Sequence, residues 1–544
     1  MLNFIYRIKK KINFRIWLSI KKTHRYFLKE KKISLVREIK SDFYNKNIDL
    51  KIENYSNYIF SNNEQLNKKI IKQYIGQFLS NNKFFYLFYF FYKKNFSGIY
   101  CLPTPYLKYF QKHYNIKINF FLSKIFFFSY VFKEFLKGTN FMIMIFFKIL
   151  KNRNKNSFFL HEPYDVIFNF SCKNFNIKKN QFDLEQYNIV NWLIKNNSCK
   201  KIILQGDDDF SYESGEIKIL SNKSIIDNVI VGLKNYKIFF TFLFFYFSTL
   251  KNLILFNWWN VVLFKDALEA LCFKFSNVKF ADNYYTIFTS NIYKPLWTYV
   301  VEKEKSKVEL LTISSLTDLE HVDKGLKFDI EGIRMSTWNI ITVWNEQSKK
   351  YITNRDNSKK DNIKVLNSHI FYKDKNQKLD LPNFSVSAFT YENHRFNLTN
   401  SFLSDWIQSY STDLFYINKK FWNDLLLMKE KYDFTLVVKK KRDFPNKFDY
   451  KRNLKFSKWL KSQYNVIEVD NNFAIEKIIH NSDISISMPF TSPSIVANYL
   501  NKKCIYYDPT SLININDPNS SGVEIISGKD NLDKFFKNYL ERKM

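Results

Sequence analysis

The segment Ile484–Pro509, with the sequence ISISMPFTSPSIVANYLNKKCIYYDP, decides the fold of this chain. Its apolar run Ile484–Met488 has the length of a buried parallel strand, and a proline ends the run. Thr491 or Ser492 is suited to cap a helix, with a further proline in its first turn. A second apolar run, Cys504–Tyr507, follows that helix. The segment therefore predicts a strand, a polar turn, a helix and a second strand.

This arrangement has a chemical consequence at the start of the helix. The first backbone amides of a helix have no partner within it, and the helix dipole places partial positive charge there. In a parallel sheet that helix start lies beyond the carboxyl end of the preceding strand. An anionic phosphate suits such a place. An ordinary N-cap with no ligand satisfies the same pattern.

Short apolar runs alternate with helical stretches through the last part of the chain, which we take as a domain of residues 381–544. Strands are predicted at Phe384–Phe389, Phe434–Val438, Val466–Val469, Ile484–Ser487, Cys504–Tyr507 and Val523–Ile526. Helices are predicted at Ser401–Ser409, Lys420–Lys431, Asn453–Ser462, Phe473–His480 and Ile495–Asn501. This rhythm is typical of an α/β fold with a doubly wound parallel sheet.

A second Rossmann-like domain is expected upstream, over residues 158–380. Its strands are predicted at Tyr164–Phe170, Lys201–Gln205, Tyr284–Phe288, Val308–Ile313, Asn339–Trp344 and His369–Tyr372. The stretch Lys349–Gln377 is rich in polar residues and favours an exposed excursion or an inter-domain connection. Residues 1–157 are basic, aromatic-rich and expected to be helical.

The chain has 544 residues, of which 46% are hydrophobic, and a formal net charge of +33. Such a charge suggests nucleic acid or an anionic membrane as partner. The lysines are spread over every segment, as in the proteins of AT-rich genomes, and no nucleic-acid-binding motif occurs. We therefore expect no nucleic-acid partner. The five cysteines are scattered and form no CxxC pair, which favours reduced thiols.

Two features bear on membrane contact. Residues 1–40 form a basic amphipathic pattern that suits either an anionic leaflet or packing on the protein's own surface. The uncharged stretches Ile238–Leu250 and Asn252–Phe264 are each too short to span a bilayer. They predict buried core helices or interfacial segments. We expect a cytoplasmic protein whose membrane contact, if present, is peripheral on the inner membrane.

The predicted carboxyl ends of the last domain's strands collect cations, hydroxyls and helix amides at one edge. Arg and Lys can neutralise the phosphate charge that grows as a sugar leaves its nucleotide. The residues at this edge that suit an anionic phosphate, and that the family resemblance described below implies for the donor phosphates, are Lys439, Lys441, Arg442, Thr491, Ser492 and Ser494. Those that we expect around the nucleotide or sugar are Asp470, Pro489, Phe490 and Asp508. The basic cluster is also explained by a solvated charge run.

The segment Met488–Ser492, followed by a helix and Tyr506–Pro509, resembles the bacterial polysaccharide biosynthesis proteins named for a PFTS motif. The runs Pro295–Tyr299 and Val343-Trp344 are also similar to that family. The resemblance implies a glycosyltransferase-like protein of GT-B type, with two Rossmann-like domains. It also implies that a basic residue after the second strand and a hydroxyl-bearing turn at a later helix hold the donor phosphates.

Glycosyl transfer needs a base for the acceptor's proton. The candidates are Glu331, Glu392 and His394, with Asp329, Glu162 and Asp165 as further carboxylates that the sequence leaves open. The pair Asp207 and Asp209 offers an alternative, a metal site of GT-A type, although three consecutive aspartates also suit a polar loop. We expect no metal and no other cofactor, because cations and helix amides can carry the leaving group.

The sequence therefore predicts a glycosyltransferase that moves a sugar from a nucleotide sugar to a growing surface polysaccharide or lipid-linked glycan. Two alternatives stay open. One is a non-catalytic polysaccharide-assembly protein of the same fold. The other is a basic nucleic-acid-binding protein that uses aromatic stacking.

Overall fold

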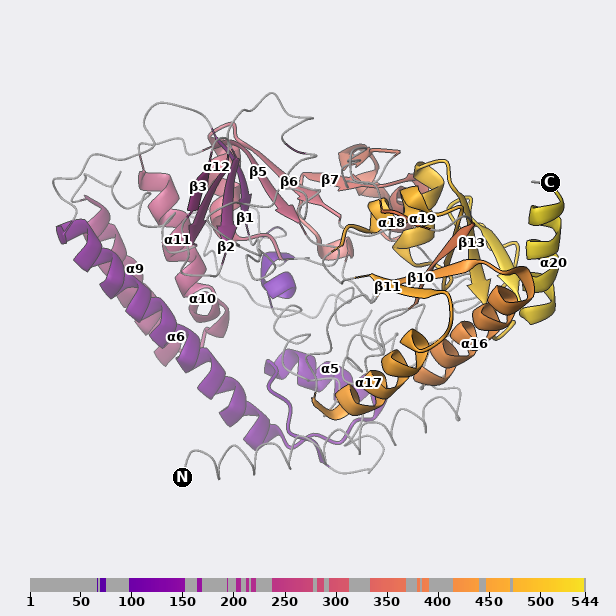
Figure 1. The fold of residues 1–544 in the computed structure, drawn as a ribbon. Helices are drawn as coiled ribbons and strands as arrows, with labels where there is room; N and C mark the ends of the chain where they lie inside the picture. Colours follow the sequence, from indigo (N-terminus) through magenta and orange to yellow (C-terminus); the bar gives the residue numbers. More distant parts are fainter. Residues whose placement is uncertain are drawn as a thin grey trace. The chain divides into compact units, whose positions relative to one another are not determined.

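The computed structural model describes two α/β units (Figure 1). The described residues are 66, 69–74, 97–151, 164–168, 193, 202–206, 212–214, 217–221, 237–276, 281–287, 293–312, 333–367, 379–381, 384–390, 414–439, 447–469 and 473–542. One compact unit comprises Met1–Asn174, Asn197–Thr312 and Phe328–Thr342, and the other comprises Phe175–Asn196, Ile313–Lys327 and Val343–Met544.

The first sheet is largely parallel and has the strand order β3-β4-β2-β1-β5-β6-β7-β8. Its strands are β1 Tyr164–Phe168, β2 Ile202–Gly206, β3 Tyr212–Ser214, β4 Ile217–Ser221, β5 Ala281–Ile287, β6 Lys307–Leu311, β7 Ile340–Val343 and β8 Ile363–Val365. Only β3 is shown to run antiparallel to its neighbour, at the edge beside β4. The strand order reverses direction between β1 and β5, which makes this pair the topological switch point.

The second sheet has six parallel strands in the order β11-β10-β9-β12-β13-β14. The strands are β9 Ser385–Phe389, β10 Thr435–Lys439, β11 Val466–Val469, β12 Ile484–Ser487, β13 Lys503–Asp508 and β14 Glu524–Ser527. In chain order this is 3-2-1-4-5-6, the doubly wound Rossmann arrangement. Its switch point lies between β9 and β12, two strands that are buried along their whole length.

The helices of the second unit connect and cover these strands. They are α14 Glu346–Thr353, α16 Leu414–Tyr432, α17 Lys447–Lys461, α18 Ile475–Asn481, α19 Ser492–Tyr499 and α20 Lys529–Glu541, with a 3-10 turn η5 at Asn357–Asn362. Between β9 and β14 every described crossover contains at least one helix, except that from β13 to β14. The doubly wound fold predicted from the sequence is confirmed by this topology.

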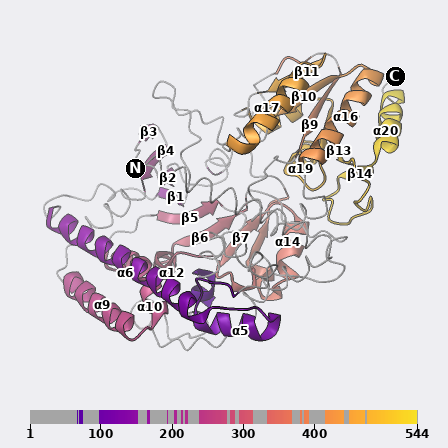
Figure 2. The same ribbon diagram turned by 90° about the horizontal axis from the view of Figure 1, so that it is seen from below.

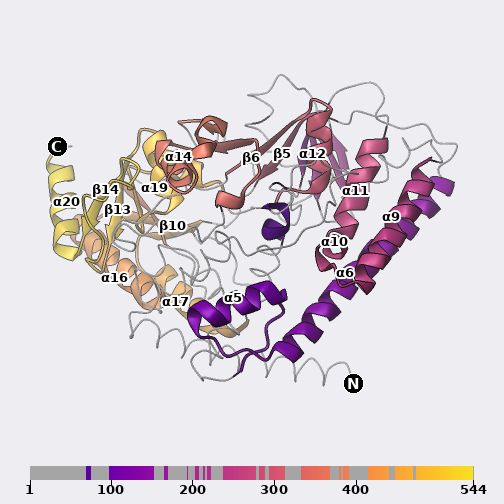
Figure 3. The ribbon, with the colours of Figure 1, turned by 180° about the vertical axis from the view of Figure 1, so that it is seen from behind.

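A helical layer accompanies the first sheet. It contains α5 Thr104–Tyr114, α6 Phe120–Lys151, α9 Lys237–Ile254, α10 Trp258–Val262, α11 Phe264–Phe275 and α12 Leu296–Lys303, with a 3-10 turn η4 at Ile333–Met335. Helices α6 and α9 lie side by side in all three views (Figures 1–3). Gly138 lets α6 approach α11, because a Cβ at this position would lie 2.2 Å from Phe264 Cδ1.

The connecting segment is partly packed. The sequence predicts that Lys349–Gln377 is an exposed excursion or an inter-domain connection; its described part holds the end of α14, η5 and β8, so it is not a wholly exposed excursion, and the connection stays a prediction. Tyr351, Ile352 and Ile363 are buried there. The few apolar residues of this segment suffice to pack it, although polar residues dominate its composition.

The boundary at residue 380 stays a proposal. Sheet membership changes between β8 and β9, whereas the compact units divide between Thr342 and Val343. The first 40 residues, with their basic amphipathic pattern, lie outside the described residues. The three described cysteines, Cys101, Cys272 and Cys504, are free.

Candidate functional site at the carboxyl edge of the second sheet

The corner between β12 and α19 lies beside the switch point of the second sheet. Strand β12 pairs with β9 from Ile484 through Ser487, and the Met488 amide extends the ladder to the Phe389 carbonyl at 3.0 Å. The chain then turns through Pro489 and Phe490 into α19. The corner therefore starts where the sheet's hydrogen bonding stops, at the place where doubly wound sheets bind ligands.

Phe490 sets the direction of the turn. Its backbone has φ 59°, a left-handed conformation that costs energy for a residue with a bulky side chain. The ring is 8% exposed and its centroid lies 5.7 Å from that of Tyr506. Burial of the ring against Tyr506 offsets the cost of the strained backbone, so Phe490 fixes the conformation of the corner.

Thr491 turns its side chain back into the corner. The Thr491 hydroxyl donates to the Met488 carbonyl at 2.7 Å, and the Thr491 amide reaches the same carbonyl at 3.3 Å. As the N-cap of α19, Thr491 has extended dihedrals, but its side chain makes no capping hydrogen bond. The usual hydroxyl cap is therefore missing, and Thr491 and Ser492 are both only partly buried.

Ser494 lies deeper and holds the corner to its neighbours. The residue is fully buried, its hydroxyl lies 2.6 Å from that of Ser487, and it donates to the Ile505 carbonyl at 3.0 Å. These contacts join α19 to β12 and β13. We therefore propose a structural role for Ser494 in place of the phosphate contact expected from the sequence.

Tyr506, in β13, supports the corner, a role that its sequence pattern does not indicate. Its hydroxyl donates to the Thr491 carbonyl at 3.2 Å, and the residue is fully buried. Burial raises the pKa of Tyr506 well above its usual range, so the phenol stays neutral and keeps its donor hydrogen. The Thr491 carbonyl is thus held by Tyr506, whereas the first amides of α19 receive no hydrogen bond from the Thr491 side chain.

Asp508 ends β13 and faces its own chain. Its carboxylate accepts hydrogen bonds from the amides of Thr510, Leu512 and Ile513, each at 2.8 Å, and from the Thr510 hydroxyl at 2.6 Å. The residue is fully buried. Because these donors occupy the carboxylate, we propose that Asp508 holds this loop and does not contact the nucleotide or sugar.

Lys439 ends β10, two strands away from β12. The strands are parallel and in register, so Lys439 and the corner share the carboxyl edge at a separation of about 10 Å between strand axes. Thr390, after β9, lies at the same edge. The structure therefore places a cationic residue and the start of α19 at the same carboxyl edge of the sheet.

The other residues expected in the site are not placed. Glu331, Glu392, His394, Lys441, Arg442 and Asp470 lie outside the described residues, as do Asp329, Glu162, Asp207 and Asp209. Asp165 is described: it is buried in β1, and its carboxylate accepts a 2.7 Å hydrogen bond from the Asn283 side chain. Within the described ranges, no three His, Cys, Asp or Glu residues gather closely enough to hold a metal ion.

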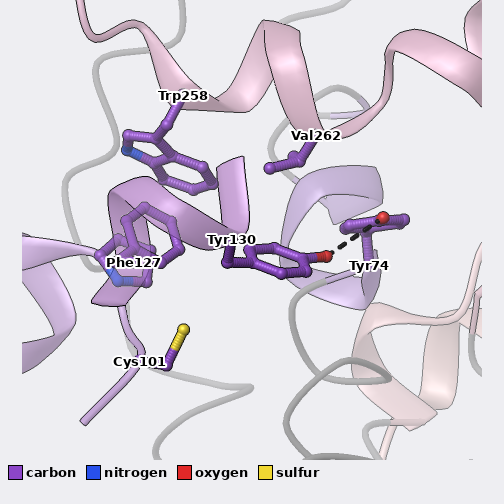
Figure 4. Close-up of a pocket in the computed structure, with 7 residues that line it drawn as sticks. Tyr74, Cys101, Phe127, Tyr130, Trp258 and Val262 are labelled. Carbon is purple, nitrogen blue, oxygen red and sulfur yellow. Dashed lines mark hydrogen bonds between the residues drawn. The ribbon is translucent and has the colours of Figure 1, made fainter. Parts of the chain in front are cut away.

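A gap between helices of the first unit offers no ligand site. Tyr74, Phe127, Tyr130 and Trp258 line it, and the Tyr130 hydroxyl donates to that of Tyr74 at 3.3 Å (Figure 4). The gap is too narrow to admit a water molecule. The edge of the second sheet therefore stays the candidate site.

Comparison with known proteins assigns the family. The sequence model of the family described as polysaccharide biosynthesis PFTS motif protein matches residues 241–536, more than half of the chain. This chain belongs to that family. The match contains both the PFTS corner and the Pro295–Tyr299 run, so the resemblance deduced from the sequence is confirmed. No curated protein matches the chain.

Several solved structures are similar to this chain at low identity. UDP-GlcNAc 2-epimerase from Methanocaldococcus jannaschii has 14% identity and a TM-score of 0.35, covering 70% of this chain and 92% of that chain. Trehalose-6-phosphate synthase OtsA has 10% identity and a TM-score of 0.38, covering 70% and 91%. Anabaena Alr3699/HepE, solved with UDP-glucose, has 8% identity and a TM-score of 0.37, again covering 70% and 91%. The two Rossmann-like units expected from the sequence agree with the two sheet topologies.

Proposed function

We propose that this member of the PFTS family is a glycosyltransferase that moves a sugar from a nucleotide sugar to a growing surface polysaccharide or lipid-linked glycan. The second unit holds the donor, with its phosphate at the start of α19. One observation carries the proposal: a helix begins at the switch point with its N-cap side chain turned away from its first amides.

The chemistry of donor cleavage fits this corner. As the sugar leaves, negative charge grows on the nucleotide phosphate, and fixed amides and a helix dipole stabilise it without reorganising. Lys439, with Lys441 and Arg442 that follow it in sequence, supplies cations for the same charge. In this proposal no metal is needed, and the donor carries a diphosphate or, as in a CMP-sugar, one phosphate.

The acceptor side is assigned by chemistry alone. The base that removes the acceptor's proton is one of Glu331, Glu392 and His394. A lipid-linked acceptor lies at the inner leaflet, so we propose a cytoplasmic enzyme that works at this membrane surface.

The experiment measures thermal stability of the full chain against UDP-, GDP- and CMP-sugars. A ligand at 100 times its dissociation constant stabilises the folded state by about 2.7 kcal/mol. Ser492→Pro should abolish this gain, because it removes one amide and one hydroxyl from the helix start. Proline is favoured at this first helical position, and the extended Thr491 before it is compatible with proline, so the fold is retained.

A matched control is Glu346→Pro at the first position of α14. Residue 346 is exposed and follows the extended Asn345, so the substitution is of the same kind. It should leave the ligand-induced stabilisation unchanged. Equal stabilisation of wild type and Ser492→Pro would remove the assignment of the corner. No stabilisation by any sugar nucleotide would favour a non-catalytic assembly protein.

A further inference from the structure

The outer side of α6 carries an apolar stripe. Its exposed large side chains recur at intervals of three, four or seven residues, the spacing of one helix face. They are Phe121, Ile125, Phe128, Phe132, Leu136, Ile143, Phe147 and Leu150. Phe121, Phe147 and Leu150 are 73%, 70% and 70% exposed. The stripe therefore runs along nearly the whole helix, over about 44 Å.

Helix α9 adds a second stripe beside the first. Ring contacts join Phe146 to Phe239 and Phe135 to Tyr246, so residue numbers increase along α9 where they decrease along α6, and the two helices are antiparallel. The exposed residues of this stripe are Phe240, Phe244, Phe247 and Ile254.

Both stripes face the same way. Helices α6 and α9 each bury their opposite side against α10 and α11, with Phe135 of α6 and Phe245 of α9 both in contact with the Phe264 ring. Figure 3 shows α6 and α9 at the outer side of α10 and α11. The two stripes thus form one surface, which we call the α6–α9 face. Exposed apolar surface of this extent marks an interaction site.

The charges around the α6–α9 face are almost all positive. The two helices contain seven lysines and one acidic residue, Glu134. That residue is buried and paired with Lys137 at 2.6 Å. The lysines Lys124, Lys133, Lys137 and Lys251 are exposed. By helical spacing Lys124 and Lys133 lie on either side of the α6 stripe, whereas Lys251 lies within the α9 stripe between Phe247 and Ile254. Lysines beside and within an aromatic face complement the interface of an anionic bilayer, where rings enter the acyl boundary and lysines extend to the headgroups.

We infer that the α6–α9 face docks on an anionic lipid bilayer, with both helices lying in the plane of the interface. In the described part of the chain no helix is long and apolar enough to cross a membrane. A second copy of the chain is a poorer occupant, because pairing two such faces would bring lysines of like charge together. The inference uses no residue of the α19 corner, so the two proposals fail independently.

Flotation of the full chain with lipid vesicles tests the inference. The protein should bind vesicles that contain phosphatidylglycerol and bind pure phosphatidylcholine vesicles less. The variant Phe121→Ser/Phe147→Ser/Phe240→Ser removes three rings that contribute little to the core, so it should fold. Its partition onto vesicles should fall by about tenfold or more, because buried aromatic area supplies the apolar part of binding.

Two further variants sharpen the result. Lys124→Gln/Lys133→Gln/Lys251→Gln should lower binding to anionic vesicles by about fivefold per lysine and leave binding to neutral vesicles unchanged. The control Leu427→Ser/Leu512→Ser/Ile515→Ser removes three exposed apolar side chains of the second unit and should bind as wild type.

Three outcomes would overturn the inference. One is unchanged flotation of the phenylalanine variant, and another is an equal loss in the control. The third is a wild-type dimer in solution that binds no vesicles and becomes monomeric in the phenylalanine variant, since that assigns the face to a second copy. Sugar-nucleotide stabilisation, measured on the same variants, reports on the α19 corner separately and should not change.

Discussion

In each sheet a helix follows a strand that borders the switch point: α12 follows β5 in the first sheet, and α19 follows β12 in the second. Both helices start near a proline, Pro295 at the N-cap of α12 and Pro493 in the first turn of α19. Neither has a side-chain cap. The two corners thus have the same topology and similar local sequence signals.

Their surroundings differ. At α12 the first residues are Leu296, Trp297 and Thr298, all buried. Lys294, just before them, is fully buried, and its ammonium lies 2.6 Å from the Glu302 carboxylate and 4.5 Å from the centroid of the Tyr299 ring. At α19 the corresponding positions hold Ser492 and Pro493, which are partly exposed, and Ser494, which is buried. Position in the fold makes a ligand site available, and the side chains decide whether it is used for binding or for packing.

The largest expected effect breaks the packed corner. Lys294→Met should lower the free energy of unfolding of the first unit by about 3–5 kcal/mol, because the largely buried Glu302 would lose its cationic partner and keep only its hydrogen bond with Asn339. Burial lowers the pKa of Lys294 and raises that of Glu302, so for both groups desolvation outweighs their attraction. Urea unfolding followed by circular dichroism measures the loss.

A double variant separates the charge effect from packing. Lys294→Met/Glu302→Leu removes both charges and should recover most of the lost stability. If Lys294→Met alone costs less than about 1 kcal/mol, the pair contributes as little as a surface ion pair. The two corners would then differ in the packing of their side chains and not in a buried ion pair.

A pH dependence of stability is expected for the packed corner of the first unit. Helix α11 packs on α12, and burial raises the pKa of Glu269 to about 7, with Lys265 opposing and Asp266 adding to the shift. The folded state therefore binds a proton more tightly than the unfolded state. This contribution to stability is complete below about pH 4.5 and is lost as pH rises through about 7.

Unfolding measured between pH 5 and 8 tests this titration. The difference in stability between wild type and Glu269→Gln should shift against wild type as pH rises, since glutamine cannot ionise. Asp266 accepts a hydrogen bond from Tyr293 and its pKa is also raised by burial, so the two carboxyls titrate as a coupled pair. A constant difference across this range would contradict the prediction.

Much of the second unit could be predicted from its sequence. The apolar runs Ile484–Ser487 and Cys504–Tyr507 match β12 and β13 within one residue at each end. Parallel strands buried on both faces are continuous apolar runs, so their sequence signal is strong. Segments that pack through a few apolar residues, such as Lys349–Gln377, give no comparable signal.

Roles of single residues in the site were less predictable. Ser494 and Asp508 were both expected to face a ligand, yet their polar groups are used by neighbouring strands and loops. Spacing along the chain predicts which face of a strand a residue lies on. It does not predict which hydrogen-bond donor or acceptor from another segment lies next to that residue. The Lys294–Glu302 pair is not evident from the sequence for the same reason, since Glu302 lies eight positions after Lys294, near the other end of α12.

The smallest expected effect concerns the support of the open corner. Tyr506→Phe deletes the hydroxyl that donates to the Thr491 carbonyl and should cost about 1 kcal/mol of stability. Because that carbonyl opens the first turn of α19, its release should also weaken sugar-nucleotide stabilisation in the thermal assay. The neighbouring Tyr507→Phe is the matched control: its hydroxyl donates to Asp424 at 2.7 Å, away from the corner. It should cost similar stability and leave ligand-induced stabilisation unchanged, whereas equal ligand effects in both variants would mean that the corner needs only a stable sheet.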